Sequence, residues 1–221
     1  RQMCIIARDY SIQHIKIENG TYVFDVKTPN TTLKNIEFNL PGRHNLSNAL
    51  VALAMSVEYG LPTKQLAKAL ASYKGVKRRF SYHIKTDKIV FIDDYAHHPE
   101  EINAVHQAVR EMYPEKKVLA VFQPHLFSRT QDFATEFAKS LSQFDQIILL
   151  DIYPARELPI EGVTSSWLLS LIENSNKKLV NKEDLISQIK QSNADVILTI
   201  GAGDIGAQVL KIKEALLGNE N

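Results

Sequence analysis

The sequence has little of several features that define whole classes of protein. Its 221 residues include one cysteine, Cys4, and its 26 lysines and arginines nearly balance 25 acidic residues, which leaves a net charge of +1. A single cysteine cannot form an intrachain disulfide, which is typical of a reducing compartment, so we expect a cytoplasmic protein. No apolar run approaches the ~18–20 residues that cross a bilayer, and no basic excess favours nucleic-acid binding. We therefore expect no membrane and no nucleic acid among its partners.

The sequence also lacks the loop that cradles phosphates in many nucleotide-binding enzymes. It contains no Gly-x-x-x-x-Gly-Lys-[Ser/Thr] run, and no Gly-Lys-Ser or Gly-Lys-Thr. If this chain belongs to an enzyme that uses a nucleotide, the main phosphate-binding loop must therefore lie outside these 221 residues. The first residue is Arg1 rather than methionine, which favours a processed chain or a piece of a longer one.

Enough apolar residues are present to form a core, because hydrophobic residues make up 44% and charged residues 23% of the chain. Residues 1–75 predict strands closed by a pair of helices. Asn19-Gly20 is typical of a tight hairpin turn, and Thr21–Val26 after it alternates between apolar and polar side chains. Helical spacing then runs over His44–Tyr59, and Thr63 is expected to cap a second helix.

After Gly75, predicted strands alternate with predicted helices. Four short apolar strands are expected, at Lys88–Ile92, Val118–Phe122, Ile147–Leu150 and Val196–Ile200. Thr130–Leu141 is expected to form one helix. This alternation implies crossover connections and a mostly parallel sheet. The expected fold is thus α/β, a Rossmann-like sheet flanked by helices and preceded by a β-rich and helical segment, with a domain boundary near Arg78–Arg79.

Polar residues follow each of these four strands. The runs are Asp93–Pro99, Gln123–Thr130, Asp151–Glu157 and Gly201–Asp204. Ligands bind beyond the carboxyl ends of the strands in open α/β sheets, because the loops there meet at one edge. Three histidines, two arginines and several carboxylates would gather at that edge, which predicts a binding or catalytic site.

Each part of this pattern also has a simpler interpretation. The His97-His98 pair could belong to a loop before a helix, and only one of the two would face a site because neighbours point apart. Asp93 and Asp94 could cap the turn that follows them. The Gly201–Gly203 run lacks the third glycine of a dinucleotide-binding fingerprint. The prediction of a site therefore rests on the convergence of these residues.

A metal site is an alternative use of some of the same residues. Asp94, His97, His125 and Asp151 are plausible ligand types, which would favour a metal-dependent hydrolase. Their spacing fits no compact metal motif, and no metal ligand is assigned. A serine nucleophile is not indicated either, because the sequence has no Gly-x-Ser-x-Gly.

Five ordered motifs resemble those of the Mur ligase family. The first, Gly42–Ala49, is similar to the family signature Gly-x-His-Asn-x-x-Asn-Ala. The others are Lys77–Phe80, Asp93–Pro99, Phe122–Thr130 and Tyr153–Gly162, and Gly201–Ile205 fits as well. The resemblance covers most of the chain from Leu40 onward. It implies that residues 1–78 end a central ATP-binding domain and that residues 79–221 form the C-terminal Rossmann-like domain.

The resemblance implies an ATP-dependent ligase of peptidoglycan synthesis, and within the family it is strongest to the member that adds L-alanine to UDP-N-acetylmuramate. In that reaction ATP phosphorylates the muramate carboxylate, and the alanine amine attacks the acyl phosphate. The anionic transition states need Mg²⁺ and cationic side chains. The chain lacks the phosphate loop and the UDP-binding domain, so it is expected to be inactive alone and to act with the rest of the same polypeptide.

The resemblance also implies roles for individual residues. The residues expected to contact nucleotide are His44, Asn45, Asn48, Arg79 (or Arg78) and Asp94. Those expected to face the muramoyl carboxylate and the incoming alanine are Tyr95, His97, His125 and Arg129. Among these, His97, His125 and Arg129 are the expected catalytic residues. A guanidinium can hold a carboxylate with two bonds, and a histidine can accept the proton of the amine.

One position departs from the family pattern. Relatives commonly have His-Arg where this chain has His125-Leu126, so a cation near the substrate is expected from Arg129 or Arg156 instead. A murein-tripeptide recycling ligase is the alternative within the family, because it shares the Asp-Asp-x-x-His-His-Pro motif. A metal-dependent hydrolase and a stand-alone nucleotide-binding module are the alternatives from other classes.

Overall fold

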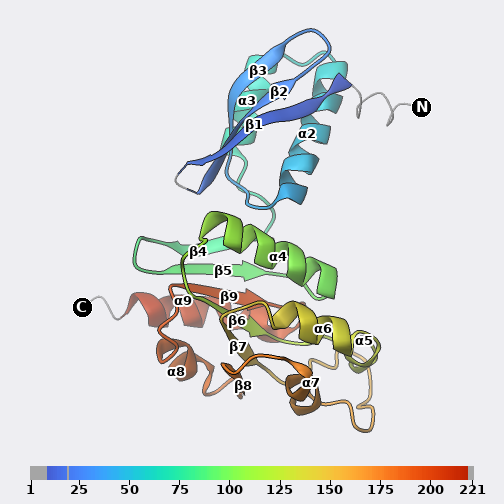
Figure 1. Ribbon diagram of the computed structural model, residues 1–221, viewed down its shortest axis with the longest axis vertical. Coiled ribbons are helices and arrows are strands. Elements are labelled where there is room, and N and C mark those ends of the chain that lie inside the picture. The colour runs from blue at the N-terminus through green and yellow to red at the C-terminus, as the bar shows by residue number, and fades with distance from the viewer. Residues whose placement is uncertain (1–8, 19, 219–221) are drawn as a thin grey trace. The chain divides into compact units, whose positions relative to one another are not determined.

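The computed structural model describes residues 9–18 and 20–218, so Cys4 and the Asn19 half of the predicted turn lie outside the described residues. The chain divides into two compact units (Figure 1). Unit 1 comprises Arg1–Gly75 with Gln107–Met112, and unit 2 comprises Val76–His106 with Tyr113–Asn221. Every helix of the described part is too short or too polar to cross a bilayer.

Unit 1 contains a three-stranded antiparallel sheet followed by two helices (Figure 1). Its elements are β1 (Ser11–Glu18), β2 (Thr21–Lys27), β3 (Thr32–Phe38), α2 (Arg43–Glu58) and α3 (Thr63–Ser72). Strand β2 buries every second side chain, Tyr22, Phe24 and Val26, as the period of a half-buried strand requires. Helix α2 buries Leu46 and Leu53, so the core of unit 1 lies between the sheet and its helices.

Unit 2 is built on a six-stranded sheet in the order β4-β5-β9-β6-β7-β8. The strands are β4 (Ser81–Lys85), β5 (Val90–Asp94), β6 (Val118–Phe122), β7 (Gln146–Leu149), β8 (Lys177–Leu179) and β9 (Val196–Ile200). Strand β4 pairs antiparallel with β5, and all the other pairs are parallel. The expected α/β fold with a mostly parallel sheet is therefore confirmed.

Helices cover both faces of this sheet (Figure 1). They are α4 (Pro99–Met112, shared between the units), α5 (Phe127–Asp132), α6 (Ala134–Leu141), α7 (Ser165–Leu171), α8 (Leu185–Lys190), the 3₁₀ turn η1 (Asp204–Ala207) and α9 (Val209–Leu217). On one face, Val121 of β6 joins a buried cluster with Leu185 of α8 and Ile212 of α9. On the other face, the ring of Phe122 packs against that of Phe137 in α6, with centroids 5.5 Å apart.

Some predicted boundaries are wrong. The strand expected at Lys88–Ile92 runs over Val90–Asp94, so two carboxylates belong to the strand itself. The single helix expected over Thr130–Leu141 is two helices that break at Phe133, whose φ of −117° is not helical. Thr63 is the first residue of α3 rather than its cap, because Pro62 takes the cap position. Helical periodicity locates a helix well but does not locate a break within one.

Candidate functional site

The carboxyl ends of four neighbouring strands in unit 2 form the edge at which the sequence predicts a site. Asp94 pairs with Ile200, Ile200 with Phe122, and Phe122 with Leu149, so the ends of β5, β9, β6 and β7 are level across the sheet. The loops that follow these strands therefore emerge side by side. The polar runs singled out in the sequence are brought together for this reason.

An ion pair ties the start of unit 2 to this edge. Arg78 Nε donates to Asp93 Oδ2 at 2.9 Å, and a terminal nitrogen of Arg78 donates to the carbonyl of Gly201 at 2.6 Å. The Asp93 side chain is only 1% exposed, and its other oxygen accepts from Thr199 Oγ1 at 2.8 Å. Asp93 thus links neighbouring strands instead of capping the turn after β5. The Arg78 guanidinium is already bonded within the fold, so Arg79 is the better candidate to bind a phosphate.

Asp94 holds two backbone segments at the same edge. Its carboxylate accepts from the N–H of Phe80 and from the N–H of Ala96, both at 2.7 Å. The bond to Ala96, two residues on, is the turn-capping contact that the sequence offered as the simpler interpretation. Burial raises the pKa of Asp94 to about 6, against the lowering effect of the two N–H donors. Both oxygens are engaged within the fold, and the predicted nucleotide contact stays a prediction.

The adjacent histidines point to different surroundings. The ring of His98 packs on Phe133 with centroids 4.6 Å apart, whereas the ring of His97 meets Tyr95 at 5.4 Å and His125 at 6.3 Å. His97 Nδ1 lies 3.0 Å from the carbonyl oxygen of Tyr95. Only His97 therefore joins the cluster, and Nδ1 donating to that carbonyl would leave Nε2 as an acceptor.

His125 lies just before α5, and Arg129 lies in the first turn of that helix. A terminal nitrogen of Arg129 lies 3.5 Å from His125 Nδ1. Burial, followed by the nearby charges of Arg129 and His97, holds the pKa of His125 below its usual range. The ring therefore stays neutral at physiological pH, which is the form that can accept a proton. Tyr95 beside them is 44% exposed, with the guanidinium of Arg78 5.0 Å from its ring centre.

The backbone at this edge is unusual at several non-glycine residues. Positive φ angles occur at Arg78 (60°), Phe80 (45°), Leu126 (72°) and Ala155 (51°). Leu126 combines its φ with a ψ of 137°, a region that is costly for a side chain with a Cβ. Strained backbone of this kind concentrates at functional sites. The residue that departs from the family pattern, Leu126, therefore also has a strained backbone conformation.

The residues expected to contact adenine lie in unit 1, in the first two turns of α2. Asn45 Nδ2 donates to the carbonyl of Pro41 at 2.6 Å, so half of its amide serves the local backbone. Asn48 is exposed one turn further on, and His44 is exposed before them. Gly42 precedes the helix with a φ of 101°, and a Cβ there would lie 2.7 Å from the His44 ring.

Two arginines of unit 2 carry free guanidinium groups among the described residues. Arg79, next to the ion-paired Arg78, is exposed and makes no side-chain bond within residues 9–18 and 20–218. Arg156 is exposed in the loop after β7. Within the same described ranges, no group of three histidine, cysteine, aspartate or glutamate side chains could hold a metal ion. The four ligand types considered for a hydrolase, including Asp94 and Asp151, are therefore not assembled as one centre.

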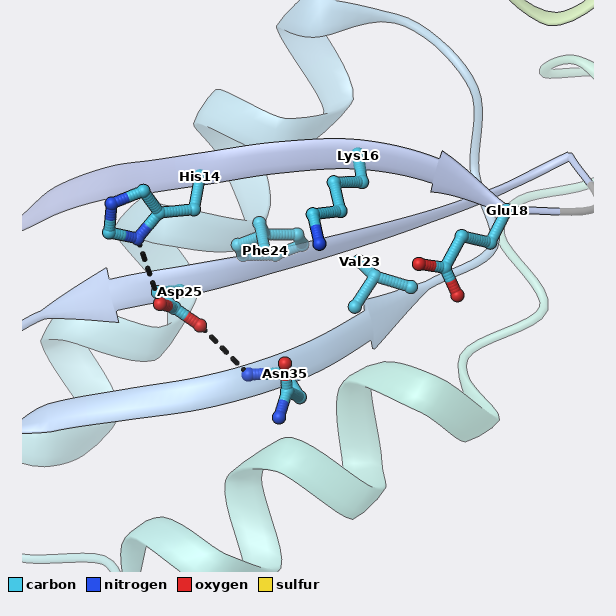
Figure 2. Close-up of a pocket in the computed structure, with 7 residues that line it drawn as sticks. All are labelled: His14, Lys16, Glu18, Val23, Phe24, Asp25 and Asn35. Carbon is cyan, nitrogen blue, oxygen red and sulfur yellow. Dashed lines mark hydrogen bonds and ion pairs between the residues drawn. The ribbon is translucent and has the colours of Figure 1, made fainter.

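A cavity of about 320 Å³ lies on the sheet of unit 1. Figure 2 shows Asp25 of β2 joined by dashed lines to His14 of β1 and Asn35 of β3. His14 and Asn35 have φ angles of 52° and 53° and form bulges on the two sides of Asp25. The carboxylate bonds the N–H of Asn35 at 2.9 Å and His14 Nδ1 at 3.0 Å. Asp25 thus stabilises two sheet irregularities, and the cavity holds no predicted site residue.

Three residues at the edge were given no role in the sequence analysis. Gln123 is 1% exposed; its Nε2 donates to Asp204 at 2.8 Å, and its Oε1 accepts from the N–H of Ile205. Ser128 and Glu157 bond each other between the loops after β6 and β7. A polar residue directly after a fully apolar strand is the signal that could have identified Gln123. Glu157 lies in the Tyr153–Gly162 motif, but its partner is set by the fold.

Comparisons with known proteins identify the family. The sequence model of the Mur ligase glutamate ligase domain matches residues 78–203. The chain is 69% identical over 203 residues to the UDP-N-acetylmuramate–L-alanine ligase of Flavobacterium psychrophilum, covering 92% of the chain and 45% of that protein. It is 66% identical over 209 residues to the ligase of the same name from Christiangramia forsetii, covering 95% and 46%. The chain therefore spans about half the length of the curated relatives that it matches.

The fold comparison agrees with the sequence comparison. The crystal structure of a UDP-N-acetylmuramate–alanine ligase from Thermotoga maritima matches with a TM-score of 0.78 and 26% identity, over 96% of this chain and 46% of that one. The match extends over both compact units, including residues before Leu40, where the sequence motifs do not reach. On the domain match, the sequence identity and the fold together, the chain belongs to the Mur ligase family.

Proposed function

We propose that this chain is part of an ATP-dependent ligase that joins L-alanine to UDP-N-acetylmuramate in peptidoglycan synthesis. The observation that carries the proposal is the high overall identity to relatives named for that reaction, over more than nine-tenths of this chain. We propose further that residues 1–78 end a central ATP-binding domain and that residues 79–221 form the C-terminal domain. The start of the domain match at residue 78 supports this division. The enzyme would act in the cytoplasm with the rest of the same polypeptide.

The edge of unit 2 offers the groups that amide formation needs. Arg129 can hold the carboxylate of a muramoyl group or of alanine, because a guanidinium offers paired donors to a carboxylate. His97, or His125 in its neutral form, can orient the incoming amine and accept its proton as the new bond forms. Tyr95 supplies an exposed ring and hydroxyl beside them. These side chains would together bind the carboxylate, orient the amine and accept its proton.

Nucleotide recognition is assigned to exposed polar groups. The Asn48 amide offers the donor and acceptor pair that suits the edge of adenine, and Asn45 retains its side-chain oxygen for the same purpose. Arg79 is a cation without an internal partner among the described residues, which suits a phosphate. Mg²⁺ would balance the charge of the phosphates when bound, and its ligands are proposed to lie outside this chain.

The test is a ligation assay on the complete gene product. ATP, UDP-N-acetylmuramate and L-alanine should together give ADP, phosphate and the alanyl product, with no turnover when any one is omitted. The murein tripeptide offered in place of L-alanine tests the recycling ligase of the same family. Turnover of the tripeptide in preference to L-alanine, or ATP-independent hydrolysis that needs a metal ion, would overturn the proposal.

A further inference from the structure

The loop after β7 is attached to the turn that carries His125. The N–H of Leu126 donates to the carbonyl of Tyr153 at 2.9 Å, and the N–H of Tyr153 donates to the carbonyl of Pro124 at 2.8 Å. His125 and Tyr153 form an isolated parallel bridge, and their rings stack with centroids 5.6 Å apart. The strained turn at Leu126 is therefore held by a neighbouring loop.

Glu157 in that loop fixes the first turn of α5. Its carboxylate accepts from the N–H of Ser128 at 3.0 Å and from Ser128 Oγ at 2.5 Å. Helix α5 has no side-chain cap of its own and no acidic residue in its first turn. These donors hold the pKa of Glu157 below its usual range, so the carboxylate is charged. Glu157, 29 residues further along the chain, thus accepts from a backbone N–H of the first turn of α5, as the side chain of a capping residue would.

The position of α5 decides where Arg129 lies. Arg129 directly follows Ser128, and its guanidinium is 3.5 Å from His125 Nδ1. Helix α5 is only six residues long, so few bonds of its own resist a rotation. A change at Glu157 would therefore move Arg129 and His125 relative to each other.

We propose that Glu157 is a positioning residue, which sets the separation of Arg129 and His125 through Ser128 and the first turn of α5 without touching a substrate. The kinetic consequences rest on the proposed function, whereas the structural part concerns this chain alone. Glu157 also acts on His125 through its charge, which opposes the lowering of the His125 pKa by Arg129.

Three variants separate these effects. Glu157→Ala removes both bonds and the charge. Glu157→Gln removes the charge but can still accept from the N–H of Ser128 and donate to its hydroxyl oxygen. Glu161→Gln is the matched control, because Glu161 is an exposed acid of the same loop with no bond in the described part of the chain.

The kinetic arm uses the complete gene product. Glu157→Ala should lower kcat/KM for L-alanine about 100-fold, because misplacement of about 1 Å can cost that much, with KM for ATP unchanged. Glu157→Gln should keep kcat within about threefold of the wild type. Both should move the acid limb of the pH–rate profile to lower pH, because removal of a negative charge lowers the pKa of His125. Glu161→Gln should change neither quantity.

A second arm is independent of catalysis. In NMR titrations of the 221-residue chain, the pKa of His125 should fall in both Glu157 variants, and the Arg129 side-chain resonance should shift only in Glu157→Ala. The positioning role would be overturned if Glu157→Ala turned over L-alanine as fast as the wild type and if its His125 and Arg129 signals did not move. Lack of ligase activity in the wild-type gene product would instead contradict the proposed function, and the NMR result would then decide the positioning role.

Discussion

The sheet edge of unit 2 and the first turns of α2 in unit 1 both carry motif residues, but they hold them in different ways. At the edge, Arg78 donates to Asp93 and to the carbonyl of Gly201, and the chain around them takes unfavourable φ angles. In α2, Asn45 bonds only its own local backbone and Asn48 faces solvent. The difference teaches that membership of a motif does not assign a role. Some motif residues build the site, and those left exposed are the candidates to bind a ligand.

The neighbouring arginines give the sharpest form of this comparison and the largest expected effect. Arg78→Ala should destabilise the protein by about 3–5 kcal/mol, because it leaves the buried Asp93 side chain without its cation. Arg79→Ala should change stability by no more than about 0.5 kcal/mol, because its side chain is exposed. Denaturant unfolding of the two variants measures both values. Equal losses of stability in the two variants would contradict a structural role for Arg78 that Arg79 does not share.

The Arg79 variant has a second expected effect, in the complete gene product. If Arg79 meets the nucleotide, KM for ATP should rise about tenfold in Arg79→Ala, which corresponds to about 1.4 kcal/mol. An unchanged KM for ATP would leave Arg79 as an ordinary surface residue.

The buried carboxylate of Asp94 predicts a pH dependence of stability. Its pKa of about 6 in the folded protein lies above the usual value of 3.8, so its stabilising contribution is complete below pH 4 and is lost as the pH rises through 6. The loss is about 3 kcal/mol at about 1.4 kcal/mol per pH unit. The unfolding free energy at pH 4 minus that at pH 7 should therefore be smaller by about 3 kcal/mol in Asp94→Asn than in the wild type. The same pH dependence in both proteins would contradict the raised pKa.

The conformation of Leu126 predicts a smaller effect. Leu126→Gly and Leu126→Ala both remove the side chain, but only glycine takes the observed φ and ψ without strain. Relief of strain, offset by the greater freedom of glycine in the unfolded chain, should leave the Gly variant more stable by about 1 kcal/mol. Thermal unfolding of the pair tests this. A more stable Ala variant would show that the turn is not strained.

The amides of α2 are expected to give the smallest effects on stability. Asn45→Ala should cost about 1 kcal/mol because it loses the bond to Pro41, whereas Asn48→Ala should be neutral within about 0.5 kcal/mol. Thermal unfolding measures both losses. A cost for Asn48 as large as that for Asn45 would give Asn48 a structural role in place of a binding one.

The sequence was informative about the fold and the location of the edge for a clear physical reason. Apolar runs such as Val118–Phe122 are fully buried strands, and parallel strands bring their carboxyl ends together whatever the loops contain. Periodicity could not show the break at Phe133 or the extension of β5 through Asp94, because both depend on tertiary contacts. Family motifs named His97, His125 and Arg129 as candidates.

What the sequence could not supply is the partner of each side chain. Nothing local distinguishes Arg78 from Arg79, and the choice depends on a carboxylate 15 residues away. The Ser128–Glu157 pair is separated by 29 residues and exists only because β6 and β7 are neighbours. Roles that depend on long-range pairing therefore require the structure.

The edge of unit 2 is proposed to carry the chemistry. The most direct test is the rate of L-alanine-dependent ADP release by the complete gene product with Arg129→Ala, together with its unfolding temperature. The account predicts a fall of at least about 100-fold in the rate with little change in unfolding temperature, because the Arg129 side chain makes one long contact among the described residues and is proposed to hold a substrate carboxylate. An unchanged rate in a folded variant would contradict the account.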